Sequence, residues 1–197
     1  MERSPSVFRR FASVLIGLSV CTALDVARAE DVPVPVDLQA TLLSKVVTYD
    51  RNLPERAGDR VRTLLVGKPS DPTSMPFVRQ MLQALGAIGN FGALPHTEEI
   101  VEFTTAAVLL ENCRNERISI VYLGPGLHND IEPIRDALQP LSILTVSANP
   151  EDVSRGIVLG FDLVYGKPKL VVHLAQARKQ RVDLMAEVLK LMRVIGA

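Results

Sequence analysis

Short runs of strand-forming residues alternate with helix-like segments along most of this chain, and this alternation constrains the fold more than any other feature. Residues 61–67, 118–123 and 142–146 are rich in Val, Ile and Leu, which is typical of buried strands. Between these runs, apolar residues recur at three- and four-residue spacing, which indicates amphipathic helices. Strands separated by helices pair in parallel and carry helices on both faces. The sequence therefore predicts an α/β three-layer sandwich with a mainly parallel sheet.

The expected helices begin at polar or proline-rich positions. Asp37 is expected to cap the first helix, whose apolar stripe comprises Leu38, Leu42, Leu43, Val46, Val47 and Tyr49. Ser74 and Pro76 open a second, with a core face of Phe77, Met81, Leu82 and Leu85. A third covers residues 104–113, and a fourth is capped by Asn129 or Asp130 and stopped by Pro140. Residues 51–59 are predicted to be a loop, and residues 100–103 an edge strand.

The last 42 residues change character. Residues 157–163 and 169–174 have strand composition, and the turn between them at residues 166–168 predicts a late β-hairpin. A packed C-terminal helix is expected to follow, with its apolar side formed by Val182, Met185, Val188, Leu189, Met192 and Ile195.

The first 29 residues have the pattern of an export signal. An arginine-rich start precedes an apolar run of about 14 residues, too short to span a bilayer, and Ala27 and Ala29 occupy the positions that signal peptidase reads. We expect residues 1–29 to be a signal peptide cleaved before Glu30, residues 30–36 to be an extended leader, and residues 37–197 to be one α/β domain in the periplasm. An uncleaved membrane anchor is the alternative.

Net charge and cysteine content narrow the classes of function that fit this chain. Removing residues 1–29 takes four of 22 basic and two of 22 acidic residues and leaves a formal charge of −2, which gives no reason to expect nucleic-acid binding. Cys113 would be the one cysteine left. It follows an apolar run, so we expect a buried, inert thiol rather than a redox switch.

The sequence carries few residues that suggest catalysis. It lacks a G-x-S-x-G elbow, a P-loop, an H-E-x-x-H helix and a C-x-x-C pair. His96, His128 and His173 lie in different elements without ligand spacing, so no metal site and no cofactor are expected. The sequence predicts a protein that is not an enzyme.

Three loops are expected to meet where parallel strands end, which is the usual place for ligands in open α/β sheets. The candidate ligand- or partner-binding residues are Lys68, Ser70, Gly124, Gly126, His128, Asn129, Ser147 and Asn149. Backbone amides near Asn129 could hold an anion at a helix start. The alternative is that these are ordinary strand–helix turns whose glycines serve only the backbone geometry.

The C-terminal part of the chain resembles a known family. Residues 156–159, 166–178 and 188–195 are similar in order and pattern to the closing segments of the YfiR-like (YfiR/HmsC) family of exported bacterial proteins. Residues 43–50 resemble the opening of that family, and residues 121–123 its central strand. The resemblance spans about residues 38–195.

The resemblance implies a non-catalytic periplasmic α/β protein involved in signal transduction. It implies binding to the periplasmic part of an inner-membrane sensor protein, with a diguanylate cyclase as the candidate partner and effects on cyclic-di-GMP and biofilm formation. Three positions depart from the family pattern: Arg51 to Pro54 replace a tryptophan-proline pair, His173 replaces an asparagine, and the paired cysteines are missing. Redox control through an internal disulfide is therefore not expected.

Two further readings stay open at the level of sequence. A periplasmic small-ligand binding protein for transport or sensing is the main alternative, because the strand-end loops would suit a ligand. A homodimer is also compatible with the sequence. An unrecognised hydrolase is disfavoured by the missing nucleophile motif.

Overall fold

The computed structural model describes residues 32–196 and places seven strands in one sheet, in the order β2-β1-β3-β4-β5-β6-β7. Neighbouring strands run parallel except β5 and β6, which form an antiparallel hairpin. This confirms the mainly parallel sheet and the late hairpin. The strands are β1 (Val61–Gly67), β2 (His96–Glu102), β3 (Ile120–Leu123), β4 (Leu144–Ser147), β5 (Leu159–Val164), β6 (Lys167–His173) and β7 (Arg193–Ile195).

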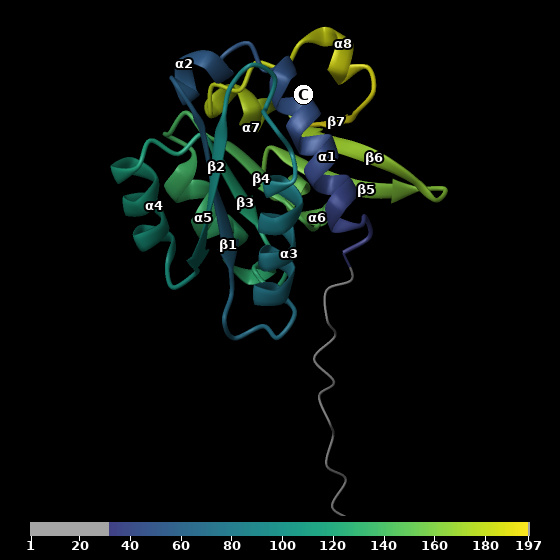
Figure 1. Cartoon of the computed structure of the whole chain (residues 1–197). Helices are drawn as coiled ribbons and strands as arrows, with labels where there is room; N and C mark the ends of the chain where they lie inside the picture. The colour runs from purple at the N-terminus through teal and green to yellow at the C-terminus, as the bar shows by residue number, and fades with distance from the viewer. Residues whose placement is uncertain (1–31, 197) are drawn as a thin grey trace, which may run out of the picture.

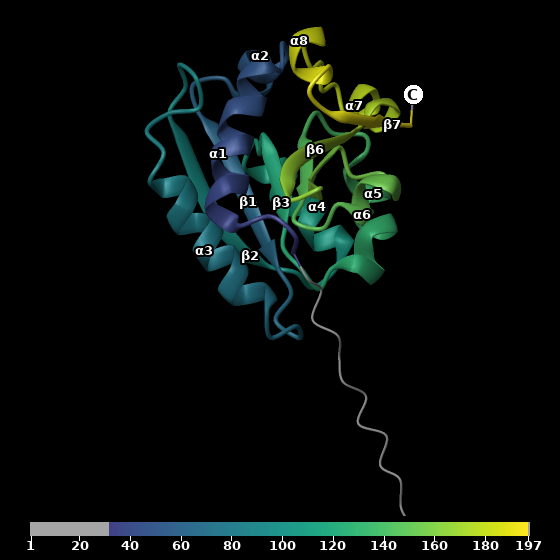
Figure 2. The ribbon, with the colours of Figure 1, turned by 90° about the vertical axis from the view of Figure 1, so that its right-hand side faces the viewer.

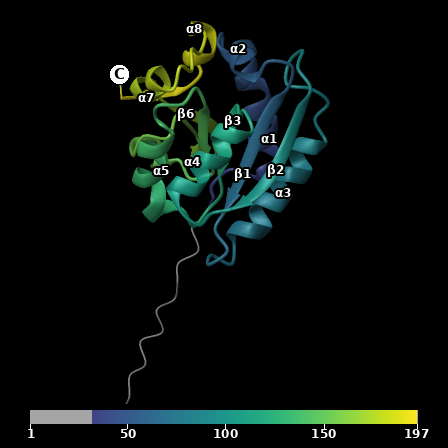
Figure 3. The ribbon, with the colours of Figure 1, turned by 90° about the vertical axis from the view of Figure 1, so that its left-hand side faces the viewer.

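Helices cover both faces of the sheet, as the alternating pattern predicts. Helices α1 and α3 lie on one face and α4 and α5 on the other, so the molecule has three layers (Figures 1 and 2). Strand β2 lies at one open edge of the sheet (Figure 3). The helical segments are α1 (Val36–Val46), η1 (Val47–Tyr49), α2 (Leu53–Ala57), α3 (Ser74–Gly86), α4 (Ala106–Asn115), η2 (His128–Asp130), α5 (Ile131–Leu138), α6 (Glu151–Ser154), α7 (Leu174–Lys179) and α8 (Ala186–Leu189).

The sheet separates two hydrophobic cores, because successive side chains of a strand point to opposite faces. In β1, Leu65 packs with α1 and α3, whereas Leu64 and Val66 pack with α4 and α5. Cys113 of α4 is 3% exposed in the second core, and burial, with Glu116 nearby, raises the pKa of its thiol to about 12. The expected burial of this cysteine is confirmed, and its low reactivity stays a prediction.

The N-terminal region differs from the prediction in detail. Helix α1 begins at Val36, and the carbonyl of Pro35 accepts the N–H of Leu38 and of Gln39, so Asp37 is not the cap. Its buried face includes the polar Gln39, while Tyr49 is 41% exposed. Burial of Gln39 is possible because its amide donates to the Val34 carbonyl over 2.7 Å and accepts the hydroxyl proton of Tyr122.

Two other segments also differ from the prediction. Residues 53–57 form helix α2 where a loop was expected, because Pro54 stands in the first turn, where its missing N–H costs nothing. Strand β2 begins at His96, earlier than expected, and pairs along its full length with β1. The expected signal peptide lies outside the described residues.

The prediction of one long closing helix over residues 182–195 is wrong, although the structure has a short C-terminal helix. The segment forms α8 over four residues and then β7, which pairs with β6. Arg181 adopts a left-handed backbone conformation (φ 55°), which no continuing α-helix allows. Residues 182 and 183 belong to no helix or strand, and Leu184 forms an isolated antiparallel bridge with Asp50. The apolar spacing therefore reflects burial of an irregular segment, with Leu191 left 67% exposed.

Candidate functional site

The three loops predicted to meet at the carboxyl ends of the strands do lie together. Lys68, directly after β1, has its ammonium 2.6 Å from the carboxylate of Asp130 at the end of η2. Gly126 follows β3 and lies so close to Asp71 that a Cβ atom there would be 2.6 Å from the Asp71 Cβ. These contacts join the loop after β1 to the loop after β3.

The loop after β4 joins the same group through a buried carboxylate, Asp152. The Ser147 hydroxyl donates to one Asp152 oxygen over 2.6 Å, and Nδ1 of His128 lies 3.1 Å from the other. The N–H of Asn149 donates to the Ser147 oxygen over 3.1 Å. Because Ser147 is fully buried and donates to Asp152 rather than to a histidine, this arrangement lacks the geometry of an activated nucleophile.

The two glycines of this site have structural reasons of their own. A Cβ on Gly124 would lie 2.8 Å from Val78 and 3.2 Å from the Val66 carbonyl, so only glycine fits between β3 and α3. Gly126 has φ 83°, the left-handed region that glycine adopts freely. These observations favour the alternative in which both glycines serve the loop backbone. Ser70 and Asn129 are exposed beside them.

Asp71 organises the loop after β1. Burial alone would raise the pKa of Asp71, but hydrogen bonds from the hydroxyl and N–H of Thr73 and from the N–H of Ser74, together with Lys68, lower that pKa below its ordinary value. The Thr73 hydroxyl donates over 2.6 Å and its N–H over 2.8 Å. The sequence analysis did not single out Asp71 or Asp152, and only the closeness of Asp152 to the β4 end could have indicated it.

A second ionic contact borders this cluster. Arg155 binds both carboxylate oxygens of Glu132 on α5, with its Nε 2.7 Å from Oε1, and also donates to the His128 carbonyl. The hydrogen bond from Arg155 lowers the pKa of Glu132. These contacts lie along a depression of about 530 Å³ with mixed polar and apolar walls, whose lining residues are His128, Pro150, Glu151, Ser154, Arg155, Asp162, Val171, Arg193 and Ile195.

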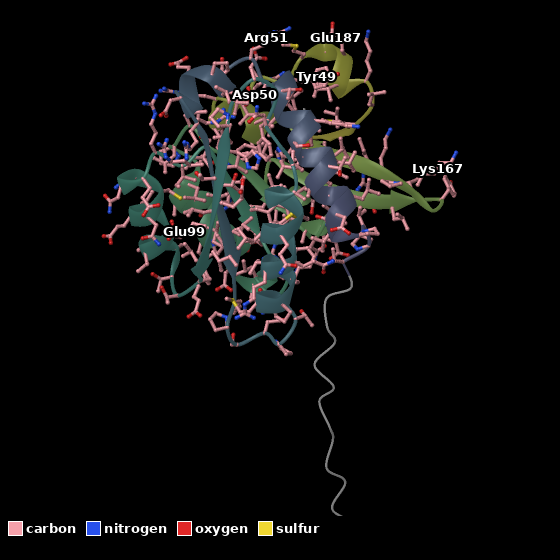
Figure 4. The ribbon with its side chains drawn as sticks, viewed as in Figure 1. Tyr49, Asp50, Arg51, Glu99, Lys167 and Glu187 are labelled. Carbon is pink, nitrogen blue, oxygen red and sulfur yellow. The ribbon has the colours of Figure 1, made fainter. Side chains whose placement is uncertain are left out.

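At the opposite end of the sheet, the carboxylate of a buried ion pair also contacts the C-terminal segment. Arg56 on α2 donates to Asp50, and both side chains are at most 2% exposed. The other Asp50 oxygen accepts the N–H of Asn52 and of Asp183, each over 3.0 Å. Figure 4 shows Tyr49, Asp50, Arg51 and Glu187 of the C-terminal segment at the same end of the molecule.

An apolar groove of about 610 Å³ opens beside this ion pair. Helix α1 and η1 form one wall, and α8 and β6 form the other. Tyr49 and Leu191 line the groove, and both side chains are largely exposed. The sequence analysis missed this groove. Its lining residues are Leu42, Ser44, Lys45, Val46, Thr48, Tyr49, Asn90, Gly92, Leu170, Glu187, Val188 and Leu191.

The three histidines do not form a common site. His96 stacks on Phe91 with ring centroids 4.4 Å apart, and His173 accepts the N–H of Gln176 at the start of α7. Burial, together with Lys179, lowers the pKa of His173. Among residues 32–196, no group of three or more His, Cys, Asp or Glu side chains could hold a metal ion. Within the same residues, no helix is long and apolar enough to cross a bilayer.

Comparison with known families agrees with this arrangement of elements. The sequence model of the family described as YfiR/HmsC-like matches residues 37–193, from α1 to β7. The chain belongs to the YfiR/HmsC-like family. No curated protein matches it.

Solved structures are similar to this YfiR/HmsC-like chain in fold, at low sequence identity. A conserved domain protein of Vibrio cholerae O1 biovar El Tor has 14% identity and a TM-score of 0.54 over 81% of this chain and 60% of that chain. An ABC domain from Streptococcus pneumoniae, in complex with L-Trp, has 10% identity and a TM-score of 0.59, over 82% and 60%. The ligand-free, open structure of CD0873, a substrate binding protein with adhesive properties from Clostridium difficile, has 9% identity and a TM-score of 0.50, over 73% and 57%. The chain spans about three fifths of the length of these structures, and the likeness concerns the fold alone.

Proposed function

We propose that this protein is a non-catalytic regulator of the periplasm that binds the periplasmic part of an inner-membrane signalling protein. Membership of the YfiR/HmsC-like family over residues 37–193 is the observation that carries the proposal. A membrane diguanylate cyclase is the candidate partner, with cyclic-di-GMP and biofilm formation as the processes that it would control. The export pattern of residues 1–29 supports action outside the cytoplasm.

The groove beside Tyr49 supports a protein partner. Most of its wall is aliphatic or aromatic, and Leu191 is 67% exposed at its side. Exposed apolar side chains around a hollow are typical of surfaces that accept an apolar anchor from another protein. We place the main contact with the partner here.

The strand-end loops form the second surface. Lys68, His128 and Ser147 hold the loops together through Asp130 and Asp152, so their polar atoms already contact other residues of the protein. Ser70 and Asn129 are exposed on the same side and remain the side chains best placed to contact a partner. Loops on a rigid sheet commonly carry recognition.

A crosslinking experiment tests the proposal. The protein is expressed with its own N-terminal segment, crosslinked in intact cells and purified from membranes, and the bound partner is identified by mass spectrometry. We expect Leu191→Asp to reduce capture of that partner strongly, because a carboxylate would be brought into an apolar contact. Val108→Asp is the matched control, because Val108 is 43% exposed on α4, on the other face of the sheet.

The same variants are compared in a deletion strain. We expect the deletion to change the cyclic-di-GMP level or surface attachment, wild type and Val108→Asp to restore it, and Leu191→Asp not to restore it. An unchanged second messenger in the deletion strain would contradict the regulatory proposal. Equal capture of the partner by both variants would contradict the position of the contact.

A periplasmic small-ligand binding protein is the second candidate. The depression beside His128 favours it, because Glu151, Arg155, Asp162 and Arg193 all line it and could contact a small polar solute. Calorimetric titration with small polar solutes tests this reading. Tight binding of one solute, combined with no effect of the deletion on cyclic-di-GMP, would favour it over the regulatory proposal.

A further inference from the structure

The β5–β6 hairpin extends beyond the body of the protein. Phe161 is fully buried, but the exposed fraction rises along β5 to 42% at Leu163 and 99% at Tyr165. On β6, residues 167 and 168 are exposed as well, and Leu163 pairs with Pro168. Figure 1 shows this tip projecting past the helices on both faces. The tip therefore presents apolar side chains that contact little of the remaining protein.

The turn itself does not explain why a tyrosine stands at its end. Tyr165 has φ 52° and Gly166 has φ 72°, so both central residues of the two-residue turn are left-handed. Asn, Asp or Gly is preferred at the first of these positions, and a bulky side chain there is unfavourable. Residues held in such a conformation often have a functional role. The tyrosine therefore stands at the most exposed point of the hairpin in a backbone conformation that disfavours it.

The net charge of the tip is positive, although Asp162 lies opposite Lys169 in the strand register. Asp162 is paired with Arg193 over 2.8 Å, whereas Lys167 and Lys169 form no ion pair within residues 32–196. At the other edge of the sheet, β2 carries exposed Glu99 and Glu102. Figure 4 shows Glu99 and Lys167 on opposite sides of the molecule. An anionic surface would attract the hairpin and repel the β2 edge.

We propose that the hairpin tip, formed by Leu163, Val164, Tyr165, Lys167 and Lys169, docks on an anionic phospholipid bilayer. Tyrosine is enriched at the membrane–water interface, and lysines beside it are attracted by anionic headgroups. The tip is too small for a stable protein interface, which takes about 20 residues from each partner. Membrane docking needs only a few apolar side chains and unpaired cations. This inference goes beyond the regulatory proposal and requires no signalling partner.

Vesicle binding of the chain from residue 30, the expected mature protein, tests the inference without any other protein. The sequence contains no tryptophan, so Tyr165→Trp introduces a single fluorophore at the tip. We expect its emission to shift to shorter wavelength with phosphatidylglycerol vesicles and to stay unchanged with phosphatidylcholine vesicles. The shift should weaken as salt is raised, because the lysine contribution is electrostatic.

Sedimentation with phosphatidylglycerol vesicles separates the contributions of the tip. Lys167→Gln with Lys169→Gln should weaken binding by about an order of magnitude, because each lysine near an anionic surface contributes independently. Tyr165→Asn should weaken it several-fold while fitting the turn better, so that misfolding does not explain the loss. The matched control, Arg178→Gln with Lys190→Gln, removes two exposed charges elsewhere and should bind like wild type.

Three outcomes would overturn the inference. The first is wild type that does not sediment with phosphatidylglycerol vesicles. The second is a control variant that loses as much binding as the tip variant. The third is an emission shift of Tyr165→Trp that depends on protein concentration without vesicles, which would indicate that the tip contacts a second copy of the chain. None of these outcomes affects partner capture at the groove, so the two proposals fail separately.

Discussion

The two ends of the sheet each bury a carboxylate, but they hold it in different ways. At the carboxyl ends of the parallel strands, Asp152 is bonded by the Ser147 hydroxyl and by a ring nitrogen of His128, which is 40% exposed. At the amino ends, Asp50 is bonded by the buried guanidinium of Arg56 and by two backbone N–H groups. Ser147 and His128 lie 5 and 24 residues from Asp152 in sequence. Asp50, in contrast, accepts a hydrogen bond from a residue 133 positions further along the chain.

This difference separates two roles for buried charge. The contacts of Asp152 arrange loops that the neighbouring strands already bring together. The contacts of Asp50 connect η1 and α2 to the C-terminal segment, where the N–H of Met185 also donates to the Tyr49 carbonyl over 2.9 Å. The end that holds the groove is centred on a buried ion pair, with the exposed Arg51–Asp183 pair beside it. The strand-end loops are held by the Lys68–Asp130 pair and by the hydrogen bonds of Asp152.

The largest expected effect is that of Asp50→Ala. This change leaves the Arg56 guanidinium buried without its carboxylate, and breaking a buried pair in this way costs about 3–5 kcal/mol of unfolding free energy. Urea unfolding of the purified protein measures it. The matched control is Asp183→Ala, which removes the Arg51–Asp183 ion pair. Both side chains of this pair are about half exposed. Its loss should therefore cost about 1 kcal/mol of unfolding free energy or less. Equal losses from the two variants would show that Asp50 does not hold this end together.

A smaller effect is expected for Asp152→Ala. The Ser147 hydroxyl would remain buried without its acceptor, and an unsatisfied buried polar group costs about 1–3 kcal/mol. The same unfolding measurement applies, with His128→Ala as the partner variant whose more exposed side chain should matter less. If Asp152→Ala destabilised the protein as much as Asp50→Ala, the proposed difference between the ends would be wrong.

The smallest effect is a pH dependence from Asp71 in the strand-end loops. Its folded pKa lies below the ordinary 3.8, so the carboxylate contributes stability above that value, and the contribution is lost as the pH falls through the folded pKa. Wild type and Asp71→Asn should therefore differ in unfolding free energy at neutral pH. This difference should shrink towards zero in acid. Chemical denaturation at a series of pH values measures it. A difference that stayed constant down to about pH 2 would contradict the role of this carboxylate.

Much of the sheet could be predicted because its strands have a local sequence pattern. The runs that became β1, β3 and β4 are buried on both faces, and such short continuous apolar runs are typical of parallel strands. The segment after residue 181 could not be predicted, because apolar spacing does not distinguish a helix from an irregular buried segment. Its path depends on the φ of Arg181 and on Asp50, which is far away in sequence.

The candidate site could also be predicted only in part. Topology alone brings together the loops that carry Lys68, His128 and Ser147, since parallel strands end at one edge. The acidic partners of those residues could not be chosen in advance, because Asp130 is 62 residues from Lys68 and looked like a helix cap. Gln39, Asp50 and Arg56 read as surface residues in the sequence and are buried only because each finds a partner. The groove draws its walls from four separate stretches of chain.

The link between Asp50 and Asp183 also sets an order of events in folding. The residues of α1 and α2 are synthesised early. The N–H of Asp183, which donates to Asp50, is synthesised 133 residues later. Until then, the ion pair lacks one of its hydrogen bonds and the groove lacks the wall formed by α8. Closing so long a loop is slow and entropically unfavourable. The groove is therefore completed only after the C-terminal segment has been made, although α1 can already pack on α3.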